Sequence, residues 1–517
     1  QLGAKTPIRL VASAKSWLCH PGVDRRSEFL PLQSPDEVKK MSPLQASAAY
    51  LSYLRHAWDA AHPDAPLSHQ QVTLTVPASF DPSARDYTIE AAHLAGLHQL
   101  TLLEEPQAAL YSWVQNHGED WRKQVKVGDI VLVVDVGGGT SDLSLVAVTE
   151  EEGSLQLNRV AVGDHILLGG DNMDLALAYR LKQKLEQEGK SLQSWQVMGL
   201  AHGCRDAKET IFADASVKSV PIVVPSRGSK LMGATLRTEL TREEVEQTLV
   251  DGFFPFVAIS DKPKQAARTA LTQMGLPYAQ DAAVTRHLAA FLCKQAAAAD
   301  AVLGNANNGE FIRPTCVLFN GGVFKAPALA ARMLDVINSW LEGAGAEPAR
   351  LLTGVDLDLA VARGAAYYGF VRRGRGVRIR GGTASSFYVG IESSMPAIPG
   401  MEPPLQALCV APFGMEEGTH ADIPSHEFGL VIGEPVRFRF FGSTVRREDL
   451  PGTLLEDWDA GELEELPEIQ AILHGEGEKL GRVVPVRLAS RVTELGALAL
   501  EAIGREPHQR WKVELNV

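Results

Sequence analysis

The sequence predicts an α/β protein that continues into an antiparallel β domain. A glycine-rich loop at 135–142 separates two strand-like apolar runs, 130–134 and 143–148. Strand-like and helix-like patterns alternate through residues 70–150, as they do in α/β folds. After the basic stretch 372–376, helix-forming runs are few, and short alternating segments are separated by Pro, Gly and acidic turns, which is typical of antiparallel β structure.

Composition limits the classes of function. The length of 517 residues predicts about three domains, and 45% hydrophobic with 22% charged residues permits a large core. A net charge of −13 argues against nonspecific nucleic-acid binding, and no apolar run reaches the roughly 18 residues of a membrane span. The five cysteines are scattered without a C-x-x-C pair, which argues against a zinc site or disulfide framework and fits a reducing cytoplasm. We see no secretory signal, and the first residue is Gln1 rather than Met, which predicts a further upstream segment.

The loop Asp135-Val136-Gly137-Gly138-Gly139-Thr140-Ser141-Asp142 carries the strongest chemical signal. Successive glycines let backbone N–H groups converge on one point, which makes a nest for an anion such as phosphate. Two aspartates beside a phosphate are reasonable if a hydrated Mg²⁺ lies between them, and Thr140 adds a hydroxyl. The alternative is a plain hairpin with a glycine-rich turn. Because a hairpin needs only one or two glycines, the sequence favours phosphate binding.

The remaining elements follow from periodicity and punctuation. In the first third we expect a helical pattern over 44–58, a strand over 71–76, a helix over 84–95, a strand over 100–103 and a helix opened by Glu105-Pro106. The middle of the chain predicts a helix over 171–185 after a second Gly-Gly, a short helix over 204–212, strands near 217–224 and 231–240, a capping box at 241–244, helices through 251–311, a buried strand over 315–320, and helices from 327 and over 359–370. The C-terminal strands are expected at 387–391, 436–441, 483–488, 497–502 and 511–517.

Taken in order, these motifs resemble the DnaK-type, seventy-kilodalton heat-shock chaperone family over roughly residues 8–375, and divergent bacterial members in particular. The resembling segments are 76–85, 95–97 and 104–109 for the first connecting segment, 135–142 for the second phosphate loop, 168–174 and 204–208 for second-lobe motifs, 320–327 for the adenosine turn and 358–366 for the last helix. The resemblance implies an actin-like ATPase fold with two lobes around a nucleotide cleft.

The implied domains are a nucleotide-binding domain over 1–375, a linker over 376–386 and a β-rich domain over 387–517. Lobe I would cover about 1–125 and lobe II about 126–375. The segment 387–392 is similar to the first strand of the family's peptide-binding β-sandwich, and no helical lid is expected because the chain ends at Val517.

The resemblance also implies site residues. Lys15, Glu105, Asp135 and Thr140 would be catalytic, and Asp135 and Asp142 would hold Mg²⁺ largely through water. The ATP or ADP would be bound by Gly137, Gly138, Gly139, Thr140, Gly169, Gly170, Lys208, Gly321, Gly322, Lys325 and Asp358. Pro77 and Arg85 match a relay that carries the nucleotide state to the substrate domain.

Several positions depart from the family. Its first phosphate loop, an Asp-x-Gly-x-Thr strand turn, would lie upstream of residue 1, so the chain reads as N-terminally incomplete and ATP hydrolysis is expected only when that segment is restored. Arg205 stands where the family has Glu, Glu209 where it has a basic residue and Phe212 where it has Ser. Lys325 replaces an Arg that stacks on adenine, although Lys208 is kept. The spacing also allows an Arg205–Glu209 ion pair on one helical face.

These features predict a chaperone-like cytoplasmic protein of the stress response that couples ATP binding and hydrolysis to the binding of unfolded or extended polypeptide. Co-chaperones are possible further partners, and neither nucleic acid nor membrane is expected. Two alternatives stay open: a nucleotide-binding scaffold without an active ATPase cycle, and a small-molecule kinase on the same fold.

Overall fold

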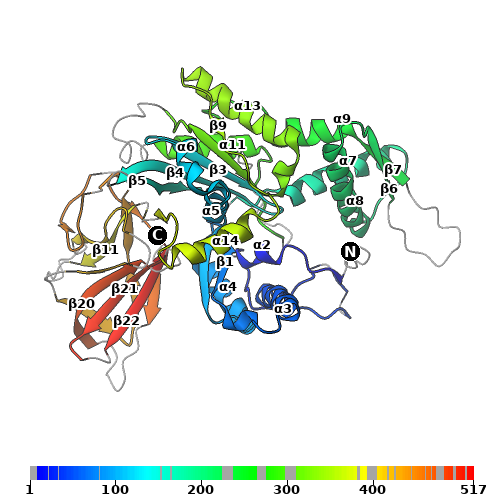
Figure 1. Cartoon of the computed structure of the whole chain (residues 1–517). Helices are drawn as coiled ribbons and strands as arrows, with labels where there is room; N and C mark the ends of the chain where they lie inside the picture. The colour runs from blue at the N-terminus through cyan, green and yellow to red at the C-terminus, as the bar shows by residue number, and fades with distance from the viewer. Residues whose placement is uncertain are drawn as a thin grey trace. The chain divides into compact units, whose positions relative to one another are not determined.

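The computed structural model describes two compact units (Figure 1). The first contains Gln1–Gln156, Val162–Ala296 and Ala306–Arg378, and the second contains Leu157–Ala161, Ala297–Asn305 and Ile379–Val517. Within them the described residues are 9–20, 22–32, 34–35, 37–80, 82–151, 154–163, 166–223, 237–264, 275–296, 310–380, 383, 385–392, 404–415, 419–423, 427–443, 445–446, 448–459, 461–466, 469–472, 482–492, 497–506 and 509–516.

A mixed sheet built on β3 (Ile130–Val136) is the centre of the first unit. Every residue of β3 is buried, which explains its nearly continuous apolar sequence. β4 (Ser141–Glu151) pairs with β3 antiparallel, and β8 (Cys316–Asn320) pairs with its other edge in parallel. β5 (Ser154–Val162) and β9 (Arg350–Leu351) lie outside these, and the two-residue strand β10 (Ile379–Arg380) pairs with β5. The parallel and antiparallel strands confirm a mixed α/β fold with several sheets.

A second, two-stranded parallel sheet leads into the helix that begins with the catalytic candidate Glu105. β1 (Val72–Val76) and β2 (Leu100–Glu104) are joined by α4 (Pro82–Leu94), and α5 (Glu105–His117) begins directly after β2. The preceding helices are α2 (Ala14–Leu18) and α3 (Pro43–Ala61), the second of which begins with a Ser42–Gln45 capping box.

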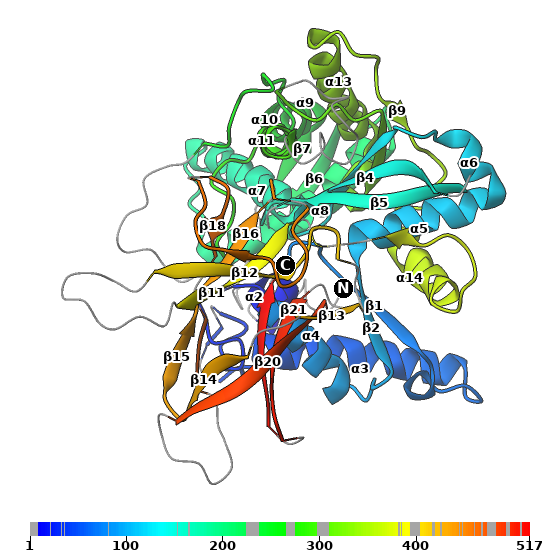
Figure 2. The same ribbon diagram turned by 90° about the vertical axis from the view of Figure 1, so that its left-hand side faces the viewer.

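The helix α14 (Ala360–Val371) lies along α5, as Figure 2 shows. At their crossing, a Cβ at Gly364 would overlap the carbonyl oxygen of Ala108. The absence of a side chain at Gly364 therefore permits the close approach of the two helices.

The remaining helices of the first unit surround the central sheet and a cavity beside the loop that follows β3. α7 (Gly170–Gln187) and α8 (Ser194–Ala213) lie side by side, and the ribbon of β6 (Ser219–Val223) and β7 (Arg237–Thr241) continues from α8 (Figure 1). The others are α9 (Arg242–Val245), a π-helical turn (Glu246–Val250), α10 (Asp251–Phe253), α11 (Val284–Lys294), the 3₁₀ turn Gly322–Lys325 and α13 (Pro327–Gly343). The predicted capping box is confirmed, because the Thr241 hydroxyl accepts a hydrogen bond from the Glu244 N–H.

Three predicted elements differ in the structure. The short helix expected over 204–212 is the second half of the 20-residue α8, whose start is obscured by Gly199 and Gly203. The region 251–311 is not helical throughout: residues 254–264 and 275–283 are irregular, as the prolines at 255, 263 and 277 require. The alanine-rich part at 297–301 lies outside the described residues.

The third difference concerns 436–441, which forms two strands rather than one. β15 (Pro435–Phe438) pairs with β19 (Ile469–Ile472), whereas β16 (Phe440–Ser443) pairs with β11 (Ser386–Glu392). The chain changes partner at Arg439, whose carbonyl accepts a hydrogen bond from the Gly390 N–H.

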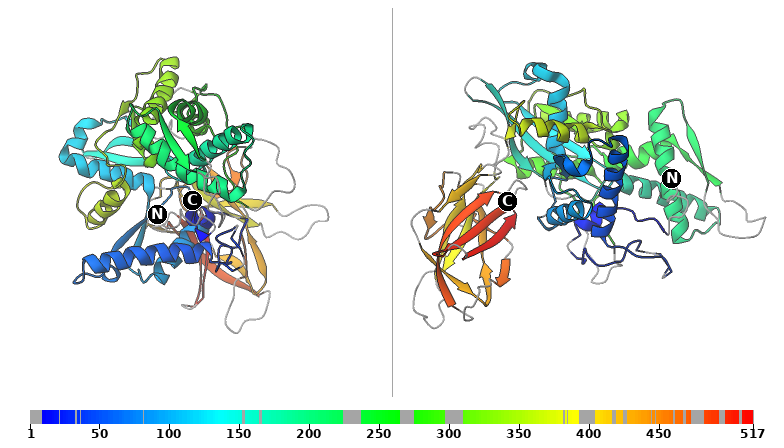
Figure 3. Two further views of the ribbon diagram at one scale, coloured as in Figure 1. Left: turned by 90° about the vertical axis from the view of Figure 1, so that its right-hand side faces the viewer. Right: turned by 60° about the horizontal axis from the view of Figure 1, so that its bottom comes forward.

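From Ile379 on, the described part of the second unit consists of strands and connections, drawn from yellow to red in Figure 3. One sheet has the order β17-β12-β11-β16-β18, with β12 at Leu405–Ala411, β17 at Leu454–Leu455 and β18 at Glu464–Glu465. The other contains β13 (His420–Asp422), β20 (Arg482–Val492), β21 (Ala497–Gly504) and β22 (Arg510–Asn516), with β14 (Phe428–Ile432) also paired to β20.

Side chains of both sheets form one buried cluster in this unit. Phe387 and Phe440 come from the first sheet, and Val486, Leu500 and Trp511 from the second. The apolar halves of the alternating C-terminal segments therefore face each other, as period-two patterning predicts.

Among the helices in the described ranges, none combines the length and the apolar character that crossing a bilayer requires.

Candidate functional site

The glycine loop connects β3 to β4 and rests on the first turn of α7. The N–H groups of Gly170 and Asp171 donate to the carbonyl oxygens of Gly137 (3.0 Å) and Gly138 (2.7 Å). Inside the loop, the Gly137 N–H donates to the Thr140 carbonyl at 2.9 Å. In all three hydrogen bonds a carbonyl oxygen of the loop is the acceptor, and together they fix the shape of the loop.

The next three loop amides point to no protein acceptor. In the ranges that the structure describes, the N–H groups of Gly138, Gly139 and Thr140 have no hydrogen-bond partner. Consecutive unpaired N–H groups are what an anion nest requires. The loop is thus both the predicted hairpin connection and a geometry suited to phosphate.

Two glycines outside the loop are required by close approach. A Cβ at Gly169 would lie 2.7 Å from the carbonyl oxygens of Gly137 and Gly138. Gly321 has φ +89°, and a Cβ there would overlap the Val136 carbonyl and lie 2.7 Å from Asp135 Oδ1. Both Gly-Gly pairs singled out in the sequence therefore let backbone pack against the loop or its strand.

Acidic side chains gather where β3 and β4 meet the loop. Asp135 and Asp142 are directly opposite in the β3–β4 register, and both are buried. The Asn320 amide donates to Asp135 Oδ2 at 2.7 Å, and the Ser79 hydroxyl donates to Asp142 Oδ1 at 2.6 Å. Burial, followed by the charges of Glu105 and Asp142, raises the pKa of Asp135 to about 7.

A lysine approaches this acidic group from α2. Lys15 Nζ lies 2.5 Å from Glu105 Oε1, on the first residue of α5. Burial alone would lower the pKa of Lys15, but the carboxylates of Glu105, Asp142 and Asp135 raise it above the ordinary value. On the same short helix, the Ser16 hydroxyl lies 3.0 Å from where a Cβ of Gly139 would stand, so α2 also borders the loop. Lys15, which has no distinction in the sequence alone, is thus brought to the other catalytic candidates.

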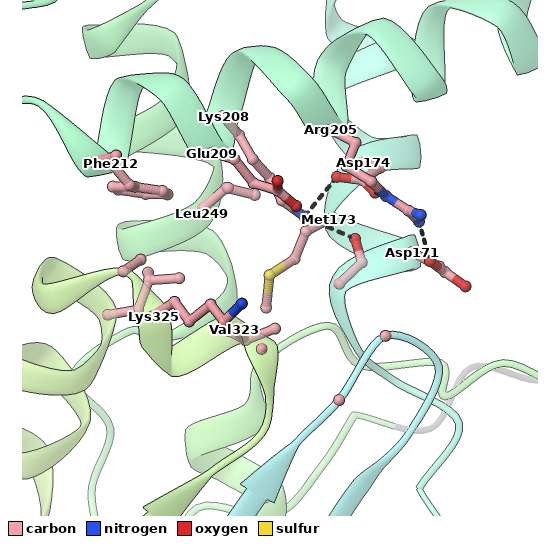
Figure 4. A pocket seen from close by; sticks show the side chains of 17 residues that line it. Asp171, Met173, Asp174, Arg205, Lys208, Glu209, Phe212, Leu249, Val323 and Lys325 are labelled. Carbon is pink, nitrogen blue, oxygen red and sulfur yellow. Dashed lines mark hydrogen bonds and ion pairs between the residues drawn. The ribbon is translucent and has the colours of Figure 1, made fainter. Parts of the chain in front are cut away.

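A cavity of about 410 Å³ opens beside the loop, between α7, α8 and the turn that follows β8 (Figure 4). It is lined by Gly137, Gly138, Gly170, Asp171, Met173, Asp174, Arg205, Lys208, Glu209, Phe212, Ala213, Leu249, Gly322, Val323, Lys325, Ala326 and Leu329. Six of the predicted nucleotide-binding residues are in this lining, namely Gly137, Gly138, Gly170, Lys208, Gly322 and Lys325. Gly139, Thr140, Gly169, Gly321 and Asp358 are adjacent to lining residues rather than part of it.

The cations of the cavity are held by carboxylates. Lys208 Nζ lies 2.5 Å from Asp174 Oδ1 and donates to the Gly170 carbonyl at 3.2 Å (Figure 4). Arg205 donates from Nε to Asp174 Oδ2 at 2.8 Å and also bonds Asp171. Arg205 thus pairs across to α7 instead of forming the i, i+4 pair with Glu209 that its spacing allows. At the other side of the cavity, Lys325 bonds Asp358.

The two relay candidates lie near the catalytic group without belonging to the cavity. Pro77 follows β1, and Arg85 on α4 is buried. The Arg85 guanidinium lies 3.1 Å from Glu104 Oε1 and donates to the carbonyls of Ala78 and Phe80.

Sequence reasoning missed the residues that support the site. Ser79 and Asn320 hold the two loop aspartates, and Asp171 and Asp174 hold the cavity cations. The signal for Asn320 is visible in the sequence, because a single polar residue ends the apolar run Val317–Phe319. Asp174 carries no such signal, since its role depends on α7 facing α8.

These residues fit a bound Mg²⁺–nucleotide. The cavity volume lies within the range of small-molecule sites, and the unpaired loop amides suit phosphate. Asp135, Asp142 and Glu105 offer carboxylate oxygens to the waters of a hydrated Mg²⁺, since no three His, Cys, Asp or Glu side chains of the described residues are grouped to hold the ion directly. A buried acceptor, Asn320 Oδ1, also lacks a partner among the described residues. The base end is less typical, since Glu209 and Phe212 line it.

An unpaired glycine nest, a carboxylate group and a lysine on a mixed α/β fold are typical of nucleotide-binding proteins. Comparison with known families makes this more specific: residues 24–270 match the family model described as Hsp70 protein. Residues 24–270 are therefore similar to the Hsp70 family, which confirms the resemblance predicted from the sequence over that segment.

Individual relatives agree with the family match. The chain is 31% identical over 211 residues to "Chaperone protein HscA homolog" of Acidovorax sp. (strain JS42), which is 41% of this chain and 30% of that protein. It is 36% identical over 144 residues to "Chaperone protein HscA" of Pectobacterium carotovorum subsp. carotovorum (strain PC1), covering 28% of this chain and 21% of that protein. A third relative, from Acinetobacter baylyi, is 33% identical over 178 residues, or 34% of this chain and 27% of that protein. The match thus spans less than a third of the length of these curated relatives.

Proposed function

We propose that this protein is a chaperone that binds Mg²⁺–ATP or Mg²⁺–ADP in the cavity beside the glycine loop and couples the nucleotide to the binding of an unfolded or extended polypeptide. The observation that carries the proposal is the row of three unpaired N–H groups, from Gly138 to Thr140, next to the buried pair Asp135 and Asp142. The relatives with known names are chaperone proteins, which supports the same function.

The assigned roles follow from charge and position. The amides of the loop would bind the terminal phosphates, with Thr140 contributing its hydroxyl. Asp135, Asp142 and Glu105 would hold the waters of Mg²⁺, which when bound neutralises the phosphate charge. Lys15 would contact the phosphate from α2, because its ammonium already lies at Glu105. Phosphoryl transfer needs mainly such positioning and charge neutralisation.

The cavity would hold the nucleoside. Lys208, which bonds Asp174 and the Gly170 carbonyl, would meet the ribose side, and Gly322 with Lys325 would border the base. We propose that the first unit is the family's actin-like ATPase domain. The two sheets of the second unit, which share one buried cluster, support a β-sandwich that binds polypeptide by strand addition. The relay role of Pro77 and Arg85 and the division into lobes and linker stay predictions, as do cytoplasmic location and stress response.

A binding and turnover experiment tests the proposal. The affinity for ATP and ADP is measured by calorimetry with Mg²⁺ and with EDTA. The steady-state rate of ATP hydrolysis is measured with and without a permanently unfolded polypeptide such as reduced, carboxymethylated lactalbumin. We expect Mg²⁺ to strengthen binding and the polypeptide to stimulate hydrolysis. Hydrolysis is measured on this chain and on the whole product of its gene.

The outcomes separate the alternatives. Tight nucleotide binding without turnover would favour the nucleotide-dependent scaffold, which the carboxylate partners of Arg205 and Lys325 make the second candidate. Absence of binding would refute the proposal. Substituting Asp135→Asn should remove most of the Mg²⁺ effect, and unchanged hydrolysis in that variant would contradict the role of Asp135.

A further inference from the structure

Asn320 is the last residue of β8 and lies beside the most important carboxylate of the proposed site. Its side-chain amide donates from Nδ2 to Asp135 Oδ2 at 2.7 Å. The residue is only 2% exposed, so water does not compete for this bond. A hydrogen bond to a buried carboxylate is among the stronger kinds in proteins.

The backbone fixes this pair from two sides. Asn320 and Asp135 are partners in the parallel register of β8 and β3, which sets their side chains next to each other. Directly after Asn320, Gly321 turns with φ +89° and packs so closely on β3 that any Cβ would overlap the Val136 carbonyl. Asn320 therefore has little freedom to move away from Asp135.

The other end of the amide gives no benefit to the fold. Asn320 Oδ1 is buried and has no hydrogen-bond partner among the residues that the structure describes. Such an orphaned acceptor costs free energy, while the rest of β8, Cys316–Phe319, is apolar and buried. An aliphatic side chain at 320 would remove this cost but would leave the buried Asp135 Oδ2 without its donor, so the contribution of the amide lies in its bond to Asp135.

We propose that Asn320 is a positioning residue of the metal–nucleotide site, which holds the Asp135 carboxylate in the orientation that Mg²⁺ binding needs. This inference rests on the proposed function, since it names a further residue of the same site. Asn320 acts through Asp135 and does not line the nucleotide cavity. Its effect is therefore confined to the Mg²⁺-dependent part of nucleotide affinity.

The test uses Asn320→Leu, which has nearly the same shape but no donor. Affinity for a fluorescent N-methylanthraniloyl ADP is measured with Mg²⁺ and with EDTA. We expect at least a tenfold loss of affinity with Mg²⁺, less than a twofold change in EDTA, and a thermal midpoint that falls because Asp135 loses its donor. Mn²⁺ binding in the presence of ADP, followed by electron paramagnetic resonance, should weaken in parallel.

Asn338→Leu is the matched control. The side-chain oxygen Oδ1 of Asn338, on α13, accepts a hydrogen bond from the Ala349 N–H at 2.9 Å. This variant should lower the thermal midpoint and leave both affinities unchanged. If Asn320→Leu behaves in the same way, or weakens binding equally with Mg²⁺ and EDTA, Asn320 is not a positioning residue.

A second substitution protects the test against misfolding. Asn320→Val is smaller and suits a strand, and it should reproduce the Mg²⁺-specific loss. If both variants unfold, the amide is needed for the fold and the inference is refuted. A wild type that binds no nucleotide would refute the proposed function, whereas normal Mg²⁺-dependent binding in the variants would refute this inference alone.

Discussion

At the scale of single residues, the site contains a buried carboxylate whose negative charge is disfavoured by the acidic side chains around it. Asp135 is 6% exposed, and its neighbours Glu105 and Asp142 are also acidic. Asn320 and Lys15 offset part of this repulsion. A bound divalent cation would offset much more, which is a physical reason for the cluster to exist.

The pKa of Asp135 predicts how stability depends on pH without ligand. Because it is raised from 3.8 to about 7, the folded chain binds an extra proton between about pH 4 and 7. The contribution of Asp135 to folding is therefore fully present below about pH 4, declines between about pH 4 and 7, and is lost above pH 7. Asp135→Asn should raise the unfolding free energy at pH 8 by at most about 4 kcal/mol and change little at pH 4. Thermal melts in EDTA from pH 4 to 8 check this, and a difference independent of pH would contradict it.

Two lysines of the cavity should differ in their contribution to stability. The Lys208 side chain is 12% exposed and its partner Asp174 is 3% exposed, whereas Lys325 and Asp358 are 49% and 67% exposed. Lys208→Met leaves a buried carboxylate with only Arg205 and should cost about 1–3 kcal/mol. Lys325→Met should cost less than about 1 kcal/mol, because exposed ion pairs contribute little. Denaturant unfolding of both variants measures the contrast, and equal losses would show that burial does not decide it.

At the scale of elements, helix contacts position the site more than helix propensity does. α5 begins at Glu105 and is clamped by α14, and α7 begins where the glycine loop rests. Glu105 therefore stands at the start of α5 and Asp135 next to the end of β3, two elements whose other residues are largely buried.

The crossing of α5 and α14 gives a sharp prediction. Gly364→Ala puts a methyl group into the Ala108 carbonyl, so the helices must separate, and we expect more than about 2 kcal/mol of destabilisation. Gly369 lies on the same helix with open space around it, and Gly369→Ala should instead stabilise by up to about 1 kcal/mol. Thermal unfolding of the pair provides the comparison. A Gly364 variant as stable as the Gly369 variant would mean that this crossing is not tight.

At the scale of the whole molecule, the chain has two units with separate cores. A ligand that binds only the folded first unit stabilises it by about 2.7 kcal/mol at a hundred times its dissociation constant. Saturating Mg²⁺–ADP should therefore raise the unfolding temperature of the first unit, which calorimetry measures. A shift of the second unit's transition as well would be the thermodynamic sign of coupling between them, and no shift in either would contradict nucleotide binding.

Local features could be predicted from the amino-acid sequence. Apolar runs predict β3, β4 and β8, the Gly-Gly pairs predict a turn after β8 and the start of α7, and Thr241 with Glu244 predicts the cap of α9. All of these depend on neighbours within a few residues of the chain, whereas the close contacts of Gly169 and Gly321 with the loop and β3 depend on the tertiary structure.

Which distant groups come into contact depends on the tertiary structure. Lys15 has no mark in the sequence, yet it lies 2.5 Å from a carboxylate 90 residues away. Arg205 pairs with the acidic residues of α7 rather than with Glu209. Asn320 lies beside Asp135, 185 residues away in the sequence, because β8 pairs with β3. Such partners depend on how the helices and strands pack rather than on spacing along the chain. Periodicity therefore predicts the strands and loops that border the site but not the side-chain contacts within it.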